Sequence, residues 1–418
     1  MISDEAPDER RIYVGLARRT DDEVQPAGLM KLVRRGVVES GEFAYGRRYL
    51  EDSAALPLNP EHLPLRDAAF ALAERRIREG GAMPLTLRDA LPDSWGRKVL
   101  EIRHGKPLSD IDALLLTNED RIGAMVFAES LPIRSEEPPS MLWSLEELAE
   151  ASHRVEAGME IGPDMHRLLR GGSLGGTRPK AAFVHEGRRY IAKFSSRGDD
   201  HDVEVIEAAT LWLASACGIH VPAFLLQSLA SGHALLVERF DRTGPVKDEQ
   251  QRHHYLSASA LLDVPYDTSR GSYVELAQLL RRISARPQED LAELFRRLVF
   301  NLAVGNSDDH VKNHGALRHE DGLWRLAPAF DLVMQLGGHT GYQELAILPG
   351  QHASSLELAR AASPHFGLSA AQADEIIRTT EETVAVQAAA SVEAAGGNRE
   401  LVRRVAAFIE QQHARIRT

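Results

Sequence analysis

The stretch Gly305-Asn306-Ser307-Asp308-Asp309-His310-Val311-Lys312-Asn313 is the most informative part of this 418-residue chain. Asn313 follows Asp308 by five positions, and Asp331, in Ala-Pro-Ala-Phe-Asp, follows Asn313 by 18. Before the stretch, apolar side chains recur at helical spacing: Leu291, Leu294, Phe295, Leu298, Val299 and Leu302. This spacing predicts a buried helix that ends where the polar stretch begins. Packing a core does not need so many polar side chains, so we interpret the stretch as a candidate site.

The order Asp308, Asn313, Asp331 suits phosphoryl transfer. Such a site needs an aspartate that accepts the proton of the acceptor hydroxyl, an asparagine five positions later that holds Mg²⁺, and a further aspartate for Mg²⁺ bound to the nucleotide phosphates. The transition state spreads negative charge over the phosphoryl oxygens, so the protein supplies cations and a positioned proton acceptor. Turns are also rich in Asp and Asn, so the five-residue spacing alone does not decide between a site and a turn.

Two upstream segments suit the same chemistry. Tyr190-Ile191-Ala192-Lys193-Phe194 has the pattern of a short strand that carries Lys193. The segment Val203 to Cys217 reads as an amphipathic helix with Glu204 and Glu207, and Glu207 is the better candidate to pair with Lys193. The alternatives are a solvated edge lysine and a solvated helix glutamate.

Between residues 171 and 180 lies the glycine-rich segment Gly-Gly-Ser-Leu-Gly-Gly-Thr-Arg-Pro-Lys. Glycines permit positive φ and let backbone amides approach phosphate oxygens without a Cβ in the way. The segment is not a Walker A loop, because Thr177-Arg178 stands where that loop requires Lys and Ser or Thr. Composition alone fits a flexible turn as well as a phosphate cradle.

In a fixed order along the chain, these blocks resemble the HipA-type serine/threonine kinases, the toxin components of bacterial toxin-antitoxin pairs. The blocks are Gly-Ser-Leu-Gly-Gly-Thr-Arg-Pro-Lys (172–180), Ala-Lys-Phe (192–194), Val-Glu-Arg-Phe-Asp-Arg (237–242), Asn-Ser-Asp-Asp-His-Val-Lys-Asn (306–313) and Ala-Pro-Ala-Phe-Asp (327–331). The amino-terminal third resembles the small domain that precedes the kinase core in this family, at Val14-Gly15-Leu16, Gly41-Glu42-Phe43-Ala44-Tyr45 and Leu56-Pro57-Leu58.

The resemblance implies roles for individual residues. Asp308 would be the catalytic base, Asn313 and Asp331 the Mg²⁺ ligands, Ser173 the autophosphorylated serine, and Glu207 the ion-pair partner of Lys193. The ATP site would comprise Gly175, Gly176, Thr177, Arg178, Pro179, Lys180, Lys193, Glu238, Arg239, Phe240, His310, Val311, Lys312, Asn313, Phe330 and Asp331. Some family members have a neutral residue after the catalytic aspartate, whereas this chain has Asp309, which either raises the proton affinity of Asp308 or points away from it.

The implied activity is an ATP- and Mg²⁺-dependent protein serine/threonine kinase that acts as a toxin. Its target would be a cellular protein of the aminoacyl-tRNA synthetase class, and its partner a HipB-like helix-turn-helix antitoxin that makes most of the contact with operator DNA. Catalytic residues describe the phosphoryl donor better than the acceptor, so a small-molecule kinase of related fold stays open. A non-catalytic corepressor module acting with a DNA-binding antitoxin is the third alternative.

The amino-acid composition limits which of these functions the chain can have. The net charge is -12, which argues against nucleic-acid binding through a uniformly basic surface. The single cysteine, Cys217, excludes an internal disulfide framework, and with no apolar leader or membrane span we expect a cytoplasmic protein without membrane contact. We expect His253-His254 to be exposed, and Arg296-Arg297 to lie on a solvated helix face.

The predicted fold is α+β: a two-lobed protein-kinase-like fold, with a small amino-terminal α+β domain and a mainly helical carboxy-terminal lobe. The predicted domains are 1–140, a nucleotide-covering lobe at 141–240, and the helical catalytic lobe at 241–418. Residues 134–140 are the expected linker. We predict helices from Leu65 to Arg78, after a capping box at Ser144 and Glu147, from Ser369 to Ala395, and from Arg399 to Arg417.

Overall fold

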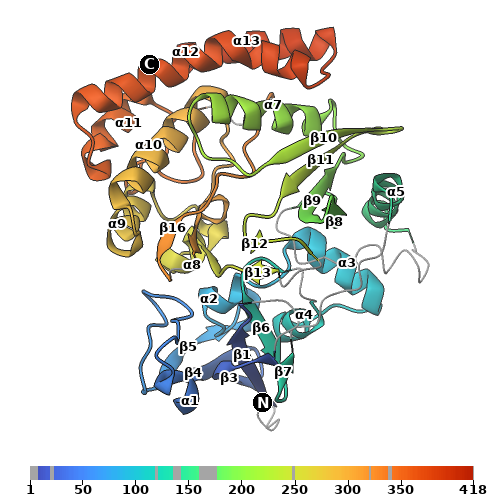
Figure 1. The fold of residues 1–418 in the computed structure, drawn as a ribbon, viewed down its shortest axis with the longest axis vertical. Helices are drawn as coiled ribbons and strands as arrows, with labels where there is room; N and C mark the ends of the chain where they lie inside the picture. The colour runs from blue at the N-terminus through green and yellow to red at the C-terminus, as the bar shows by residue number, and fades with distance from the viewer. Residues whose placement is uncertain are drawn as a thin grey trace. The chain divides into compact units, whose positions relative to one another are not determined.

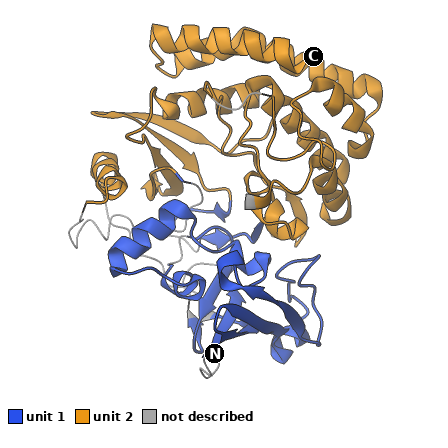
Figure 2. Ribbon diagram, turned by 180° about the vertical axis from the view of Figure 1, so that it is seen from behind, with its two compact units in different colours: residues 1–141, 170–177, 241–256 blue, residues 142–169, 178–240, 257–418 orange. Residues whose placement is uncertain are grey.

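The computed structural model describes residues 8–18, 23–117, 121–134, 143–159, 177–246, 250–319, 322–337 and 341–417. The chain divides into two compact units (Figure 2). Unit 1 comprises residues 1–141, 170–177 and 241–256, and unit 2 comprises residues 142–169, 178–240 and 257–418. The division into domains at 1–140, 141–240 and 241–418 stays a prediction. The two compact units are divided differently, because residues 241–256 belong to the same unit as the amino-terminal part.

Unit 1 is built on a five-stranded sheet in which neighbouring strands run antiparallel. Its order is β5 (Phe70–Arg76), β4 (Val38–Tyr45), β3 (Pro26–Arg35), β1 (Asp8–Leu16) and β6 (Met125–Ala128). Alternate residues of a strand face opposite sides, and Ile12, Val14 and Met30 are accordingly buried on one side of the sheet. Shorter elements complete the unit: β2 (Glu23–Val24), α1 (Arg47–Glu51), η1 (Ile77–Glu79), α2 (Leu85–Arg88), α3 (Ser94–His104), α4 (Asp110–Leu116), β7 (Ile133–Arg134), β12 (Arg242–Thr243) and β13 (Gln251–Arg252).

Two predictions about unit 1 are wrong. The segment predicted as a helix from Leu65 to Arg78 instead contains the edge strand β5, whose backbone pairs with β4 from Phe70↔Phe43 to Arg76↔Val38. Pairing with an available sheet edge outweighs the helix propensity of Ala-Leu-Ala-Glu-Arg-Arg, and the charged side chains suit an exposed edge. His253 and His254 are buried rather than exposed, and Nε2 of His254 lies 2.8 Å from the carbonyl oxygen of Leu58.

Unit 2 begins with α5 (Leu145–Glu156), which opens with the predicted capping box at Ser144. A four-stranded antiparallel sheet comes next, in the order β10 (Phe224–Leu229), β11 (Gly232–Glu238), β9 (Arg188–Phe194) and β8 (Lys180–His185). Helix α7 (Val203–Ala216) packs against β10 and β11, and the Asp202 side chain caps it by accepting from the Val205 amide (Figure 1).

The rest of unit 2 is mainly helical. Its elements are α8 (Ala258–Leu262), η2 (Tyr266–Thr268), α9 (Tyr273–Ile283), α10 (Pro287–Val304), η3 (Val311–Asn313), β15 (Gly315–Arg318), β16 (Trp324–Leu326), α11 (Leu356–Ala362), η4 (Ser363–Phe366), α12 (Ala370–Ala394) and α13 (Arg399–Ile416). Strand β14 (Tyr255–Ser257) spans the boundary between the units. Helices α12 and α13 lie side by side, and α12 also packs on α7 and α10 (Figure 1). The predicted helices opening at Ser369 and Arg399 are confirmed.

An apolar cluster joins α7, α10, α12 and α13. It includes Ile206, Phe300, Val304, Val384, Val392 and Val405, all fully buried. Arg297 on α10 is buried as well, contrary to the predicted solvated face, because its guanidinium donates to the Ala327 carbonyl oxygen and to Glu293. Helix α10 is therefore fixed on several sides, and its carboxy end is a rigid base for the polar loop that starts at Gly305.

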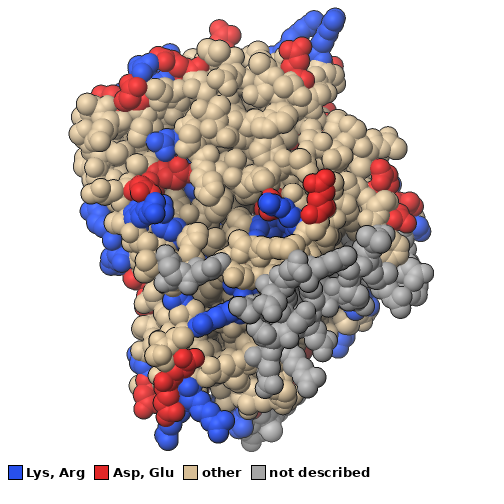
Figure 3. Space-filling view, in the orientation of Figure 1, with Lys and Arg blue, Asp and Glu red and all other residues tan. Residues whose placement is uncertain are grey.

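The described surface carries both charge signs. Figure 3 shows Lys and Arg side chains interspersed with Asp and Glu on the face in view. Of the described helices, none combines the length and the apolar character required to cross a membrane.

Candidate phosphoryl-transfer site

The polar stretch begins where α10 ends. Gly305 caps the helix with φ of 64°, a left-handed conformation that glycine adopts without strain. A Cβ at this position would lie 2.6 Å from Cζ of Phe408 on α13, so the close packing of α13 also requires glycine. The chain can thus turn sharply from a buried helix into the loop that carries Asp308.

The two neighbouring aspartates have different environments. Asp309 is 1% exposed, and its carboxylate accepts hydrogen bonds from the Tyr273 hydroxyl and from Nε2 of His314. Asp308 is exposed and lines a cavity. Asp309 is therefore a buried anchor of the loop, and Asp308 is the carboxylate that an external group can reach.

Asn313 and His310 complete the loop. Nδ2 of Asn313, at the end of η3, donates to the backbone carbonyl oxygen of Asp308 at 2.8 Å, which leaves its Oδ1 directed away from that bond. A positive charge on the His310 ring lowers the pKa of both Asp308 and Asp331. Lys312 lies over the ring of Tyr266, with Nζ 4.7 Å from the ring centroid, and Val311 is buried.

The Lys193 side chain contacts carboxylates from two other segments of the chain. Its ammonium donates to Glu207 on α7 at 2.5 Å and also to Asp331, which lies 138 residues away in the sequence. Lys180 stands directly opposite Lys193 on the neighbouring strand β8. The predicted pairing of Lys193 with Glu207 is therefore present, and the same lysine reaches the aspartate of Ala-Pro-Ala-Phe-Asp.

Burial and neighbouring charges set the protonation states. Burial disfavours the ammonium of Lys193, but Asp331 and Glu207 outweigh it and raise the pKa of Lys193. Burial likewise opposes ionisation of Asp331, yet Lys193 and Lys180 lower the pKa of that carboxyl. Partial desolvation raises the pKa of Asp308; His310 opposes this, while Asp331, Glu344 and Asp309 add to it. Lys193 is thus charged and Asp331 ionised at neutral pH, and Asp308 binds a proton more readily than an ordinary aspartate.

Asp331 has a strained backbone. Its φ is 53°, the left-handed region that residues with a Cβ rarely adopt. Such strain persists only where surrounding contacts hold it, and here Lys193 holds the side chain.

The glycine-rich segment is described only from Thr177 onward, so the predicted Ser173, Gly175 and Gly176 lie outside the described residues. Arg178 makes a two-pronged ion pair with Asp199 at 2.7 and 2.6 Å, and it also donates to Glu204 at 3.2 Å. Its guanidinium thus ties the exit of the segment to the first turn of α7. Pro179 is buried, and its carbonyl oxygen accepts from the Phe194 amide.

Three residues of the predicted ATP site, Glu238, Arg239 and Phe240, lie at the end of β11 or directly after it. The backbone N–H of Glu238 donates to Ala223 and that of Arg239 to Arg189, so neither amide is available to a base. The Glu238 side chain pairs with Arg188 at 2.9 Å. The rings of Phe240 and Phe330 lie 5.6 Å apart, which brings two predicted ATP-site residues together from different elements.

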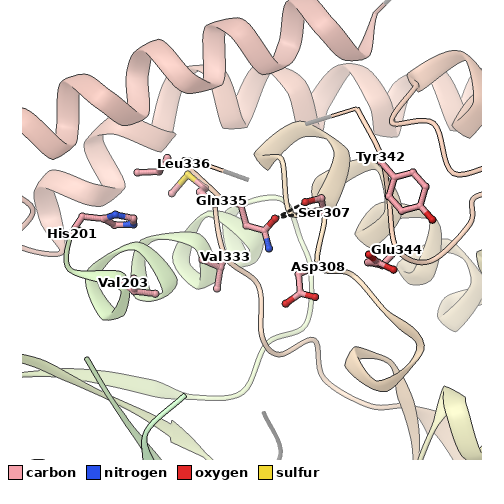
Figure 4. A pocket seen from close by; sticks show the side chains of 11 residues that line it. His201, Val203, Ser307, Asp308, Val333, Gln335, Leu336, Tyr342 and Glu344 are labelled. Atoms are coloured by element: carbon pink, nitrogen blue, oxygen red, sulfur yellow. Dashed lines mark hydrogen bonds between the residues drawn. The ribbon is translucent and has the colours of Figure 1, made fainter. Parts of the chain in front are cut away.

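A cavity of about 650 Å³ lies beside Asp308 (Figure 4). Its lining comprises His201, Val203, Ser307, Asp308, Val333, Met334, Gln335, Leu336, Gly337, Tyr342 and Glu344. Lys193 and Asp331 do not line it, so the cavity is distinct from the lysine-aspartate cluster. Neither Gln335 nor Glu344 could be predicted as a site residue, because neither belongs to a spaced motif.

The donor set fits a magnesium-bound nucleotide. Mg²⁺ is usually held by one or two carboxylates together with phosphate oxygens, and Asp331 and the Oδ1 of Asn313 supply hard oxygen ligands. Lys193 and Lys180 supply positive charge near Asp331 for phosphate. No group of three or more His, Cys, Asp or Glu side chains among the described residues is placed to hold a metal ion by itself.

The fold is that of a known kinase structure. The chain aligns with the toxin in a solved complex of the Shewanella oneidensis toxin-antitoxin system, HipA with HipB and its operator DNA. The TM-score is 0.69 at 18% identity, over 97% of this chain and 96% of that one. The predicted α+β, kinase-like fold is thereby confirmed. The chain has the fold of the HipA-like kinases.

A family model described as the HipA-like C-terminal domain matches residues 172–388, and the chain therefore belongs to this family. Named relatives include "Putative kinase Y4mE" of Sinorhizobium fredii, 29% identical over 317 residues, which cover 70% of this chain and 71% of the relative. The "Serine/threonine-protein kinase toxin HipA" of Shewanella oneidensis is 27% identical over 203 residues, covering 42% of this chain and 45% of the relative. Kinase relatives imply ATP as the phosphoryl donor.

Proposed function

We propose that this chain is an ATP- and Mg²⁺-dependent protein serine/threonine kinase with Asp308 as its catalytic base. The observation that supports it best is the Lys193 cluster: one ammonium held between Glu207 and Asp331, in the same unit as the exposed Asp308. A lysine held by a helix glutamate, beside a metal-binding aspartate, is the arrangement that kinases need in their active state.

Each residue has a distinct task. Bound Mg²⁺ and ATP would supply charge neutralisation and the phosphoryl group. Lys193 and Lys180 would bind phosphate oxygens, and Asp331 and Asn313 would hold the metal. Asp308 would accept the proton that the acceptor hydroxyl loses, and its raised pKa makes that transfer more favourable. Phe240 and Phe330 would contact the adenine.

Further parts of the proposal rest on family resemblance. They are autophosphorylation of Ser173, a target of the aminoacyl-tRNA synthetase class, a cytoplasmic site of action, and inhibition by a HipB-like helix-turn-helix antitoxin that makes most of the operator-DNA contact. The Shewanella oneidensis complex, which contains HipA, HipB and operator DNA, supports the partner assignment.

Intact-mass analysis after incubation with ATP and Mg²⁺ tests the activity. We expect the native chain to gain one phosphate at Ser173 and Asp308→Asn to gain none. The matched control is Asp374→Asn, which removes an exposed carboxylate on α12 and should gain the phosphate normally.

Labelled ATP in cell extract separates the alternatives. Label in protein bands supports the proposal, and label confined to metabolites favours a small-molecule kinase. A native chain that transfers no label but still binds its antitoxin would favour the corepressor module.

A further inference from the structure

Lys180 and Lys193 stand directly opposite each other on the neighbouring antiparallel strands β8 and β9. Both ammonium groups bind phosphate in the proposed function, on which this inference rests. Like charges in this position repel each other and weaken the pairing of the two strands. Lys180 is also the first residue of β8, and strand ends separate most easily, yet it is only 6% exposed. A contact that holds the start of β8 in place would offset this repulsion.

Arg178, two residues before Lys180, makes such a contact. Its guanidinium donates to both carboxylate oxygens of Asp199, at 2.7 and 2.6 Å, and to Oε1 of Glu204 at 3.2 Å. Burial disfavours the charge of Arg178, but the two carboxylates outweigh it and raise the pKa of the guanidinium. The three side chains therefore form a charged cluster, which we call the arginine clamp.

The side chain of Arg178 is poorly placed to bind phosphate itself, although the family resemblance implies that this residue belongs to the ATP site. Burial opposes ionisation of Asp199, yet Arg178 lowers the pKa of that carboxyl, so the guanidinium already faces a full negative charge. Any ionisation of Glu204 adds to it. A phosphate gains little attraction from a neutralised cation and is repelled by the carboxylates around it.

We propose that the arginine clamp positions Lys180 beside Lys193 for the phosphates of the nucleotide. Asp199 is itself held in place, since its Oδ2 also accepts from the backbone N–H of Ser196 at 2.7 Å. Both residues lie in the loop that connects β9 with α7. The clamp thus joins the start of β8 to the segment between the strand that carries Lys193 and the helix that carries Glu207.

Helix α7 links the clamp to the second lysine. Glu204 and Glu207 are three residues apart, so their side chains share one face of the helix. Glu204 accepts from the guanidinium of the clamp, and Glu207 accepts from Lys193. The helix packs on α12 and on strands β10 and β11, which fixes it in place. Because one rigid helix holds both ion pairs, loss of the clamp would free Lys180 to move away from Lys193.

Nucleotide binding by clamp variants tests this inference. Arg178→Met removes the guanidinium but keeps an unbranched side chain, and Asp199→Asn, a milder change, removes its ionised partner. The matched control is Arg360→Met, which removes an exposed ion pair with Asp374 in the same unit. The readouts are the Kd of ATP with Mg²⁺ and the Kd of adenosine, which lacks phosphates, both by calorimetry. Urea unfolding verifies that each variant is folded, and Asp199→Asn decides the outcome if Arg178→Met is not.

We expect both clamp variants to raise the Kd of ATP about tenfold, the effect of weakening one charge-assisted hydrogen bond to phosphate. The Kd of adenosine should stay the same, and the control should bind both ligands like the native chain. In chains that already carry Lys180→Met, the clamp variants should change the Kd of ATP by less than about twofold, because the lysine that the clamp positions is absent.

An unchanged Kd of ATP in the clamp variants would overturn the inference. An equal rise in the Kd of ATP and of adenosine would also overturn it, since this would show a general loss of structure. So would a full effect of the clamp variants in the Lys180→Met chains. A native chain that does not bind ATP at all would instead refute the proposed function itself, and this inference with it.

Discussion

Replacing Glu204 by Gln should change how stability depends on pH. The Glu204 side chain is 2% exposed in the first turn of α7; one oxygen accepts from Arg178 at 3.2 Å, and the other is buried and has no hydrogen-bond partner among the described residues. Burial raises the pKa of Glu204 to about 7, although Arg178 opposes the shift. The folded state therefore binds this proton more tightly than the unfolded chain does.

The sign and size of the effect come from linkage. A raised folded-state pKa gives stability that is fully present below the unfolded pKa, about 4.5, and is lost as pH rises through about 7. Each pKa unit corresponds to about 1.4 kcal/mol. The free energy of unfolding of the native chain should therefore fall by roughly 2–3 kcal/mol, relative to that of Glu204→Gln, between about pH 5 and 8. Other titrating groups cancel in the difference between the two chains.

Urea unfolding followed by tryptophan fluorescence, at several pH values across this range, measures the difference. Glu400→Gln is the matched control, because Glu400 also occupies the first turn of a helix, α13, but is exposed. Replacing Glu400 should lower the free energy of unfolding by only a few tenths of a kcal/mol, the usual effect of removing a negative charge from the first turn of a helix. A difference between native and Glu204→Gln that stays constant from about pH 5 to 8 would show that the buried carboxyl does not titrate as argued.

Three further outcomes are expected. Glu344→Gln removes a negative charge that raises the pKa of Asp308, so the acid limb of the kcat–pH profile should move to lower pH; a shift upward would contradict the assignment. Asp309→Ala leaves the Tyr273 hydroxyl and the His314 ring without their acceptor and should cost about 3 kcal/mol in urea unfolding, whereas a neutral effect would mean that the anchor is dispensable. Gly305→Ala combines a left-handed φ with a contact on Phe408 and should cost roughly 2 kcal/mol; calorimetry showing no fall in Tm would exclude this constraint.

The sequence predicted the elements whose signals are local. The helix ending at Gly305 has a repeating apolar face and a glycine cap, and the helices after Ser144 and Ser369 have capping boxes. For the segment around Phe70 the sequence predicts a helix, because nothing within the segment reveals the sheet edge of β4, against which it pairs.

For the candidate site, too, the sequence predicted some features and left others open. Spacing along the chain predicted that Asp308, Asn313, Asp331, Lys193 and Glu207 belong together. The five-residue spacing to Asn313 selected Asp308 rather than Asp309 as the base, but it left open whether Asp309 raises the proton affinity of Asp308 or points away from it.

By itself, the sequence predicted several of the helices and a set of candidate site residues, because helical periodicity, capping and motif spacing act over a few residues. Only the tertiary structure decided that Asp309 is buried between Tyr273 and His314 while Asp308 lines a cavity, and that Lys193 reaches Asp331 across 138 residues. Burial and ion pairing depend on which distant segments pack together, and they raise the pKa of Asp308 and lower that of Asp331.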